Sequence, residues 1–185
     1  MIGREIIDLA ATYGYTMTLL DLGGGYPGNR GSSINDIATI INGALDEYFP
    51  EGCGVDIIAE PGRYYVASAF TLATRIFGRR QLTNEDDDSM SYFYYINDGV
   101  YGSFNCMLYD HATVTPLLLE PRPGPNYAST IWGPTCDGLD QIASNTEMPL
   151  MHVGDWLVFQ DMGAYTLAAA GTFNGFPIPK VTIQI

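Results

Sequence analysis

Apolar residues recur at helical spacing in three stretches of the first part of the chain. One stretch predicts a helix over residues 4–13, after which Gly14 is a natural C-terminal cap. A second predicts a helix over residues 33–48, whose first turn Ser33 can cap. A third helix is predicted over residues 64–76.

The apolar runs between these helices are short and continuous, as in strands buried on both faces. They cover residues 16–22 and 55–60. The order helix, strand, helix, strand, helix predicts parallel strands joined by crossover helices. Two buried parallel strands cannot close a barrel or make a self-sufficient sheet, so we expect their partner strands outside this chain or in another copy of it.

The pattern becomes that of a β protein beyond an acidic stretch at residues 84–89. A metal site is one interpretation of that stretch, and a solvated surface loop is the usual one. Residues 163–170 fit a short helix or a closely packed segment of small residues. Turn residues separate the predicted strands, as in an antiparallel sheet, and the strands cover residues 92–96, 107–109, 114–118, 156–159 and 181–185.

The net charge narrows the classes of partner. The 185 residues include 8 Lys and Arg against 21 Asp and Glu, for a formal charge of −13. Nucleic acid and anionic membrane surfaces need a basic footprint, so we expect neither as a partner. The charge fits a cationic ligand, or simply solubility.

The three cysteines, Cys53, Cys106 and Cys136, lie far apart. Because no CxxC pair exists, zinc and thioredoxin-like sites fail on spacing, and we expect no bound metal. Reduced thiols in a cytoplasmic protein are the simplest account, and the N-terminus has no signal-peptide hydrophobic region. The single lysine, Lys180, leaves little scope for lysine-based covalent chemistry.

Two candidate binding sites follow directly after the predicted strands, at the end where parallel α/β folds bind ligands. The triple glycine Gly23-Gly24-Gly25 would let the backbone approach an anion such as phosphate, and the alternative is a flexible loop. The carboxylate of Glu60 can pair with a protonated ring nitrogen, while Arg63 can grip phosphate. The alternative for these two is a mutual surface ion pair.

A third candidate is the stretch of residues 132–140, where glycine and proline favour a turn. It sets Cys136 beside Asp137, and the competing interpretation is a polar loop with a buried structural cysteine. A nucleophilic Cys136 would need a base that lowers its pKa, and the sequence shows none. Elsewhere Asp110 follows Tyr109, and an aspartate beside an aromatic ring suits a primary ammonium group.

The motifs run in order through nearly the whole chain and comprise residues 20–28, 59–66, 97–106, 109–111, 132–140, 154–156, 162–166 and 172–176. Taken together they resemble the eukaryotic ornithine decarboxylase family, within the fold-type III group of pyridoxal-phosphate enzymes. Arginine and diaminopimelate decarboxylases share the glycine and Glu-Pro-Gly-Arg motifs. The stretch around Cys136 resembles the ornithine type.

The resemblance implies an α/β plus all-β fold. Residues 1–69 would be the last units of a (β/α)8 barrel that binds pyridoxal 5'-phosphate. Residues 70–185 would form a C-terminal β-domain, an antiparallel β-sandwich with Greek-key-like connections. The implied reaction is decarboxylation of L-ornithine to putrescine, in polyamine biosynthesis, by a head-to-tail homodimer with two shared active sites.

The resemblance also implies a role for each candidate residue near the cofactor. Glu60 would pair with the pyridine nitrogen and keep the ring an electron sink. The cofactor phosphate would be held by Gly23, Gly24, Gly25, Arg63 and Tyr165.

A second set of residues would face the substrate. By resemblance, Asp110 with Tyr109 would bind the distal amine of ornithine, and Phe173 would line the pocket. Cys136 and Asp137 would reach into the partner subunit's site, where Cys136 controls protonation of the reacting carbon and Asp137 helps to bind the amine. Acidic side chains at these positions suit a dibasic amino acid and a diamine product.

The chain departs from the family pattern in one respect. The family's Schiff-base lysine belongs to a part of the barrel that this chain does not contain, and Lys180 lies in a different motif. We therefore expect this chain to act as part of a longer enzyme and to be inactive by itself.

The alternative is a non-catalytic regulator of the antizyme-inhibitor type, or an inert fragment. Those inhibitors tend to lose parts of the cofactor and thiol motifs, whereas Arg63, Cys136, Asp137 and Tyr165 are all retained here. Antizyme is a further partner that the family implies, although its usual binding region is not in this chain.

Overall fold

The computed structural model describes residues 2–184, which divide into two compact units between Ala67 and Ser68. This division lies two residues before the predicted one. Among the described residues, the N-terminal unit has a sheet of two strands and the C-terminal unit a sheet of six.

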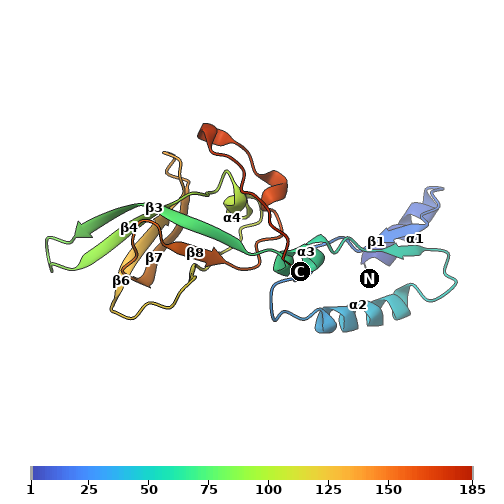
Figure 1. The fold of residues 1–185 in the computed structure, drawn as a ribbon. Helices are drawn as coiled ribbons and strands as arrows, with labels where there is room; N and C mark the ends of the chain where they lie inside the picture. The colour runs from blue at the N-terminus through green and yellow to red at the C-terminus, as the bar shows by residue number, and fades with distance from the viewer. Residues whose placement is uncertain (1, 185) are drawn as a thin grey trace. The chain divides into compact units, whose positions relative to one another are not determined.

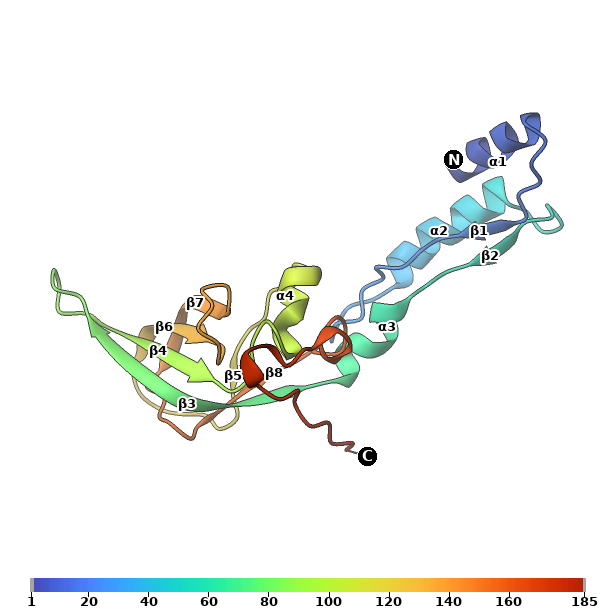
Figure 2. The same cartoon turned by 90° about the horizontal axis from the view of Figure 1, so that it is seen from above.

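The N-terminal unit has the predicted α/β order. Its elements are α1 (Ile2–Thr12), β1 (Leu19–Asp21), α2 (Asn35–Tyr48), β2 (Asp56–Ile58) and α3 (Gly62–Val66), with the 3-10 turn η1 (Ala67–Ala69) at the boundary. β1 and β2 pair in parallel, with Leu20 opposite Ile57, and α2 runs alongside them (Figure 2). The Ser33 hydroxyl accepts a hydrogen bond from the Asn35 amide at 3.1 Å, at the start of α2. Within the described residues, no helix is both long and apolar enough to cross a membrane.

The prediction that both strands of this unit are buried is wrong. No residue of β1 or β2 is buried, and neither α1 nor α2 has a buried residue. Ile40 of α2 is 73% exposed and Ile58 of β2 is 45% exposed. The physical reason is the size of the sheet, because two strands offer too little surface to cover the apolar faces of the helices beside them.

The C-terminal unit is built on the six-stranded sheet, in the order β5-β8-β3-β4-β6-β7. Its strands are β3 (Leu72–Thr83), β4 (Met90–Ile96), β5 (Leu117–Leu118), β6 (Asn126–Trp132), β7 (Gln141–Pro149) and β8 (Trp156–Phe159). Its helical turns are η2 (Ser103–Asn105), α4 (Cys106–Tyr109), η3 (Leu167–Ala169) and η4 (Phe173–Gly175). In Figure 1, β3 and β4 form a long hairpin that closes through residues 84–89.

The sheet is mixed, which corrects the prediction of a purely antiparallel domain. β4 and β6 run parallel, with Phe93 opposite Thr130, and the other neighbouring pairs are antiparallel. Parallel neighbours need a long crossover connection, and the segment from Asn97 to Pro125 is long enough to supply one.

The predicted helix over residues 64–76 is also wrong. Only α3 and η1 are helical there, and β3 begins at Leu72. Buried Thr74 and Ile76 alternate with exposed Ala73 and Arg75, so this segment has the period of two that a strand needs.

Further on, the short apolar segments were the hardest to predict. Residues 107–109 form the helical turn α4 rather than a strand, and Met107 and Leu108 are good helix formers. Residues 181–184 form no strand, and Ile185 lies outside the described residues. β5 covers two residues of the predicted 114–118, η3 lies within 163–170, and β8 is confirmed at residues 156–159. The long strands β6 and β7 were not predicted.

The core of the C-terminal unit lies on one face of this sheet. Phe104 of η2 packs edge-to-face on Phe159 of β8, with ring centroids 4.8 Å apart. Tyr94 of β4 is fully buried, and its hydroxyl accepts a hydrogen bond from the Met151 amide at 3.1 Å. The η2–α4 segment is thereby held against the sheet, and this segment leads to the candidate site.

The substitution Tyr94→Phe should lower the free energy of unfolding by about 1–3 kcal/mol, because it leaves the buried Met151 amide without an acceptor. Urea unfolding of the whole chain, followed by circular dichroism, measures the change. Tyr13 is 75% exposed, so Tyr13→Phe is the matched control and should change stability by less than about 0.5 kcal/mol. Equal stability of the two variants would contradict the role of this hydrogen bond.

Candidate functional site

The triple glycine forms a loop that hydrogen bonds hold in place. The Gly23 amide donates to the Asp21 carboxylate at 2.8 Å, and the Gly23 carbonyl accepts from the Glu60 amide at 2.7 Å. Gly23 and Gly25 have φ values of 68° and 82°, in the left-handed region that favours glycine. The loop after β1 is therefore joined to the loop after β2, where Glu60 and Arg63 lie.

Two of the glycines are required by close backbone packing. A Cβ atom on Gly24 would lie 2.5 Å from the Glu60 carbonyl oxygen, and one on Gly28 would lie 2.3 Å from the Arg63 carbonyl oxygen. Neither position has room for a side chain. The structure thus brings the predicted phosphate loop, the exposed Glu60 and the half-buried Arg63 together within the N-terminal unit.

The loop of residues 132–140 joins β6 to β7 and is organised around Asp140. The Asp140 carboxylate is fully buried. It accepts hydrogen bonds from the Val100 amide at 2.8 Å, the Thr135 amide at 2.9 Å and the Thr135 hydroxyl at 2.8 Å. The Gly133 amide donates to the Asp140 carbonyl at 2.7 Å, which closes the base of the loop.

Cys136 is exposed near the tip of this loop, so the interpretation of it as a buried structural thiol is wrong. The buried thiol is that of Cys106 in α4. Burial raises the pKa of Cys106, and the negative charge of Asp110 adds to the effect. Of these two thiols, only Cys136 is open to a ligand.

Asp137 is held beside Cys136 by two donors. The Leu139 amide donates to Oδ1 at 3.0 Å, and the Tyr101 hydroxyl donates to Oδ2. These two hydrogen bonds, led by the one from Leu139, hold the pKa of the Asp137 carboxyl below its ordinary value. The same contact raises the pKa of Tyr101. The loop therefore presents an ionised carboxylate next to an exposed thiol.

Phe173 joins the same group through Tyr101. The two rings are 4.3 Å apart at their centroids and inclined by 37°. Tyr101 therefore connects two of the residues predicted to face the substrate, Asp137 and Phe173. Tyr101 belongs to the motif of residues 97–106, but it was not itself predicted as a site residue, and its place in that motif was the only available signal.

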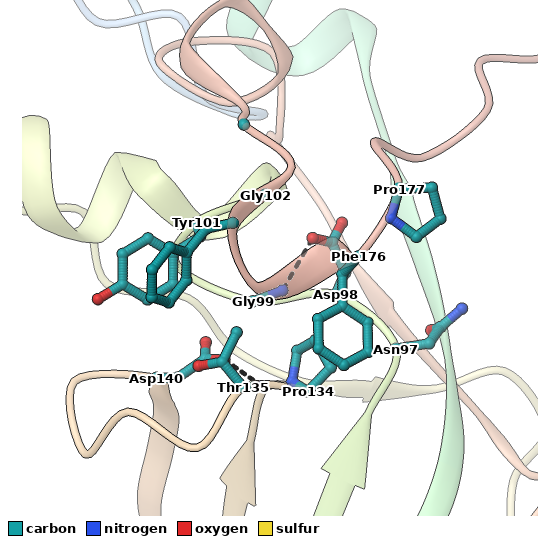
Figure 3. Close-up of a pocket in the computed structure, with 12 residues that line it drawn as sticks. Asn97, Asp98, Gly99, Tyr101, Gly102, Pro134, Thr135, Asp140, Phe176 and Pro177 are labelled. Carbon is teal, nitrogen blue, oxygen red and sulfur yellow. Dashed lines mark hydrogen bonds between the residues drawn. The ribbon is translucent and has the colours of Figure 1, made fainter.

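A pocket in the C-terminal unit lies next to these residues (Figure 3). Figure 3 shows Asp98 and Asp140 approaching it from two different loops. Its lining comprises Asn97, Asp98, Gly99, Tyr101, Gly102, Pro134, Thr135, Asp140, Gly171, Phe173, Phe176 and Pro177. Neither aspartate was predicted as a functional residue. The two lie far apart in the sequence, so nothing in it indicated that they line one pocket.

Asp98, one of the residues that line this pocket, has a buried carboxyl group. It is only 6% exposed, and Oδ1 accepts from the amides of Gly99 at 2.8 Å and Ser103 at 2.9 Å. Burial raises its pKa, the hydrogen bonds from Ser103 and Gly99 partly offset this, and the nearby Asp140 raises it further. Asp98 is therefore easier to protonate than an ordinary aspartate, and Asp137 is harder.

The remaining predicted site residues lie elsewhere in the C-terminal unit. Tyr109 is exposed at the end of α4, and the Asp110 amide caps that helix by donating to the Cys106 carbonyl at 3.0 Å. Tyr165 has a left-handed φ of 54° and is 52% exposed. The described residues contain no cluster of three or more His, Cys, Asp or Glu side chains that could hold a metal ion.

Comparison with known proteins identifies the family. Residues 12–163, most of the chain, match the family described as pyridoxal-dependent decarboxylase, C-terminal sheet domain. The chain belongs to this decarboxylase family. The predicted resemblance is confirmed.

The similar proteins include two kinds, ornithine decarboxylases and antizyme inhibitors. Ornithine decarboxylase of Cricetulus griseus is 54% identical over 188 residues, a match that covers 96% of this chain and 41% of that protein. Antizyme inhibitor 2 of Xenopus laevis is also 54% identical, over 183 residues that cover 94% of this chain and 40% of that protein. The decarboxylase-family chain thus spans about two fifths of the length of these relatives.

Solved structures show the same fold. The arginine decarboxylase of Paramecium bursaria Chlorella virus, bound to agmatine, gives a TM-score of 0.81 at 35% identity, covering 94% of this chain and 46% of that one. The lysine/ornithine decarboxylase of Vibrio vulnificus, complexed with putrescine, gives 0.77 at 35% identity, covering 95% and 46%. The curled mixed sheet is therefore the C-terminal sheet domain of fold-type III pyridoxal-phosphate decarboxylases.

Packing around Asp140 predicts that alanine substitutions at two glycines of the same loop differ sharply in their effect on stability. A Cβ on Gly133 would lie 2.1 Å from Oδ1 of Asp140, whereas one on Gly138 would meet nothing within 4 Å. Gly133→Ala should cost about 1–3 kcal/mol of unfolding free energy, and Gly138→Ala less than about 0.5 kcal/mol. Urea unfolding of both variants tests this, and a similar loss in both would refute the proposed packing.

The two shifted carboxyl groups predict opposite pH dependences. As pH rises above the ordinary aspartate value of 3.8, unfolded Asp98 loses its proton before folded Asp98 does, so its contribution to stability falls until the folded pKa is passed. For Asp137, whose folded pKa is lowered, the contribution is present above 3.8 and is lost as pH falls below it.

Urea unfolding between pH 2.5 and 8 measures this. The wild-type chain should lose stability relative to Asp98→Asn as pH rises, and gain stability relative to Asp137→Asn. Two flat difference curves, or two of the same sign, would show that the environments of these carboxyl groups are not as described.

Proposed function

We propose that this chain is part of a pyridoxal-phosphate-dependent enzyme that decarboxylates L-ornithine to putrescine. The observation that carries the proposal is the loop of residues 132–140, which presents an exposed Cys136 beside an ionised Asp137. A thiol and a carboxylate side by side suit a site that binds an ammonium group and returns a proton to carbon. The 54% identity to ornithine decarboxylase and the net charge of −13 support a dibasic substrate.

The N-terminal unit fits the phosphate end and the ring nitrogen of pyridoxal phosphate. Gly24 has no room for a side chain, so the loop can offer only backbone groups to an anion. Arg63 adds a permanent positive charge, and the exposed Glu60 can pair with a protonated ring nitrogen. Gly23 and Gly25 would complete this set, and Tyr165, which belongs to the C-terminal unit, is a further proposed phosphate contact. When bound, pyridoxal phosphate supplies an electron sink for the carbon that loses its carboxylate.

The C-terminal unit would handle the substrate. In this proposal the carboxylates of Asp137 and Asp110 accept hydrogen bonds from the distal ammonium group. Tyr109 packs against that group, and Phe173 forms an apolar wall. The Cys136 thiol delivers a proton to the carbon left by decarboxylation. Its exposed position at the loop tip supports this role, because a proton donor must reach the reacting atom.

We propose further that the enzyme is a homodimer whose two sites are shared. The cofactor residues Glu60 and Arg63 belong to one compact unit, and Cys136 and Asp137 belong to the other. In this arrangement the loop of residues 132–140 serves the site of the partner copy. An active site assembled from two copies is a normal consequence of a symmetric interface.

The second candidate function is that of a non-catalytic regulator. It is favoured by one observation, the 54% identity to antizyme inhibitor 2 of Xenopus laevis, which equals the identity to ornithine decarboxylase. The retained Arg63, Cys136, Asp137 and Tyr165 support the enzyme instead, since these are residues proposed to bind cofactor and substrate.

Joining this chain to the N-terminal segment of Cricetulus griseus ornithine decarboxylase that precedes the matched region should give an enzyme that releases CO2 from L-ornithine. Release of labelled CO2 and formation of putrescine measure the activity. A folded, cofactor-loaded chimera without activity would favour the regulatory alternative.

In that chimera Arg63→Ala and Cys136→Ala should fail in different ways. Arg63→Ala should weaken cofactor binding roughly 10- to 150-fold, because a charge-assisted phosphate contact is worth about 1.5–3 kcal/mol. Cys136→Ala should keep the cofactor but slow product formation about 100-fold or more, through loss of the proton donor. Cofactor absorbance and product analysis separate the two, with Cys53→Ala as the thiol control. Equal loss of cofactor in both variants would refute the assignment of roles.

Mixing those two impaired variants tests the shared site. If Arg63 and Cys136 of one chain serve different sites, a mixed dimer contains one site with neither substitution and recovers part of the activity. A mixture no more active than the two variants alone, after subunits have exchanged, would rule out the shared arrangement.

A further inference from the structure

Tyr101 lies among the residues proposed to bind the substrate, but it is not itself one of them. Its hydroxyl donates to Asp137, and its ring packs on Phe173. It comes from the turn after β4, whereas Asp137 comes from the loop before β7 and Phe173 from η4. Tyr101 is therefore the point at which three separate segments of the C-terminal unit meet.

The position of the Tyr101 ring is itself determined by its neighbours. Phe173 packs against it with centroids 4.3 Å apart, and the Tyr101 carbonyl accepts from the Gly171 amide at 2.8 Å. On its other side, the preceding residue Val100 donates its amide to the buried Asp140. A ring held by backbone and stacking contacts can hold a hydrogen-bond partner in one orientation.

The hydrogen bonds of Asp137 leave part of its carboxylate open to a ligand. Oδ1 accepts one bond, from Leu139, and Oδ2 accepts one, from Tyr101. An ionised carboxylate has about four lone-pair directions, so each oxygen keeps one for another donor. The directions already used determine where an ammonium group can bind, and the aromatic faces of Tyr101 and Phe173 favour a cation nearby.

We propose that Tyr101 is a positioning residue for the distal ammonium group of the substrate: it fixes the Asp137 carboxylate in the orientation that receives this group. The inference rests on the proposed function, in which Asp137 binds that ammonium. It adds that affinity for the distal ammonium group depends on the Tyr101 hydroxyl, which donates to Asp137 and not to the substrate.

The first test uses the 185-residue chain alone. Tyr101→Phe keeps the ring and its stacking on Phe173 but removes the donor to Asp137. The pKa of the Asp137 carboxyl, followed by carbon-13 NMR titration, should rise, because a hydrogen bond to the ionised form is lost. Tyr13→Phe should leave it unchanged. An unchanged Asp137 pKa in a folded Tyr101→Phe chain overturns the inference.

The second test is kinetic and uses the chimera. Loss of a hydrogen bond to a charged group should raise KM for L-ornithine roughly tenfold, while kcat stays within about twofold, the pattern expected when substrate binding alone is weakened. Asp137→Asn should raise KM at least as much, and Tyr13→Phe should change neither parameter.

The outcomes separate this inference from the proposed function. A raised KM in Asp137→Asn with a normal KM in Tyr101→Phe overturns the role of Tyr101 alone. A normal KM in Asp137→Asn overturns the proposed role of Asp137, and the role of Tyr101 with it. A loss of kcat without a change in KM for Tyr101→Phe also overturns the positioning role.

Discussion

The fully buried carboxylate of Asp140 organises the candidate substrate site. A charge without water is costly unless hydrogen bonds replace the solvent. Here the replacement comes from neutral donors, the amide of Val100 and the amide and hydroxyl of Thr135. Because these donors lie on two loops far apart in sequence, satisfying one carboxylate also joins the two loops.

This link determines what the outer residues can do. The Asp140 amide donates to the Asp137 carbonyl at 3.0 Å, and Tyr101 follows directly after Val100. Backbone and side-chain contacts thus form a closed circuit from Asp140 through Val100 and Tyr101 to Asp137 and back. The buried Asp140 therefore helps to fix the position of the Asp137 carboxylate, and the exposed Cys136 is the residue next to Asp137.

Sequence patterns predicted the first two helices and the two strands of the N-terminal unit well, and the C-terminal sheet poorly. Periodicity located α2 and β1, but the same apolar runs wrongly indicated burial, since burial depends on neighbours that a local pattern cannot see. β3 carries a period of two from Leu72 onward, yet its small and polar residues weaken that signal. The parallel pairing of β4 with β6 joins segments about thirty residues apart, and no local pattern specifies such a pairing.

In the candidate site, the motifs indicated residues that the structure brings together, but not the residues that hold them in place. The pairing of Cys136 with Asp137 and the glycine loop were visible as motifs. Asp140 lies within the predicted turn of residues 132–140, but nothing in its sequence neighbours indicates its burial. Tyr101 was indistinguishable from the other tyrosines until its contact with Asp137 was known. Residues that act on a ligand leave a local signal, while residues that hold them depend on long-range contacts.

The crowding around Asp140 has a consequence for how such a site can evolve. Cβ atoms on Gly99 and Gly133 would each lie 2.1 Å from the same oxygen of Asp140. None of the three positions can change freely while the other two stay as they are, because residues that share one space have non-additive effects. A lineage that shortens residue 140 gains room for side chains at 99 and 133 but cannot easily return once they are filled. We therefore expect positions 99, 133 and 140 to tolerate substitution only in combination, which constrains the loop that carries Cys136.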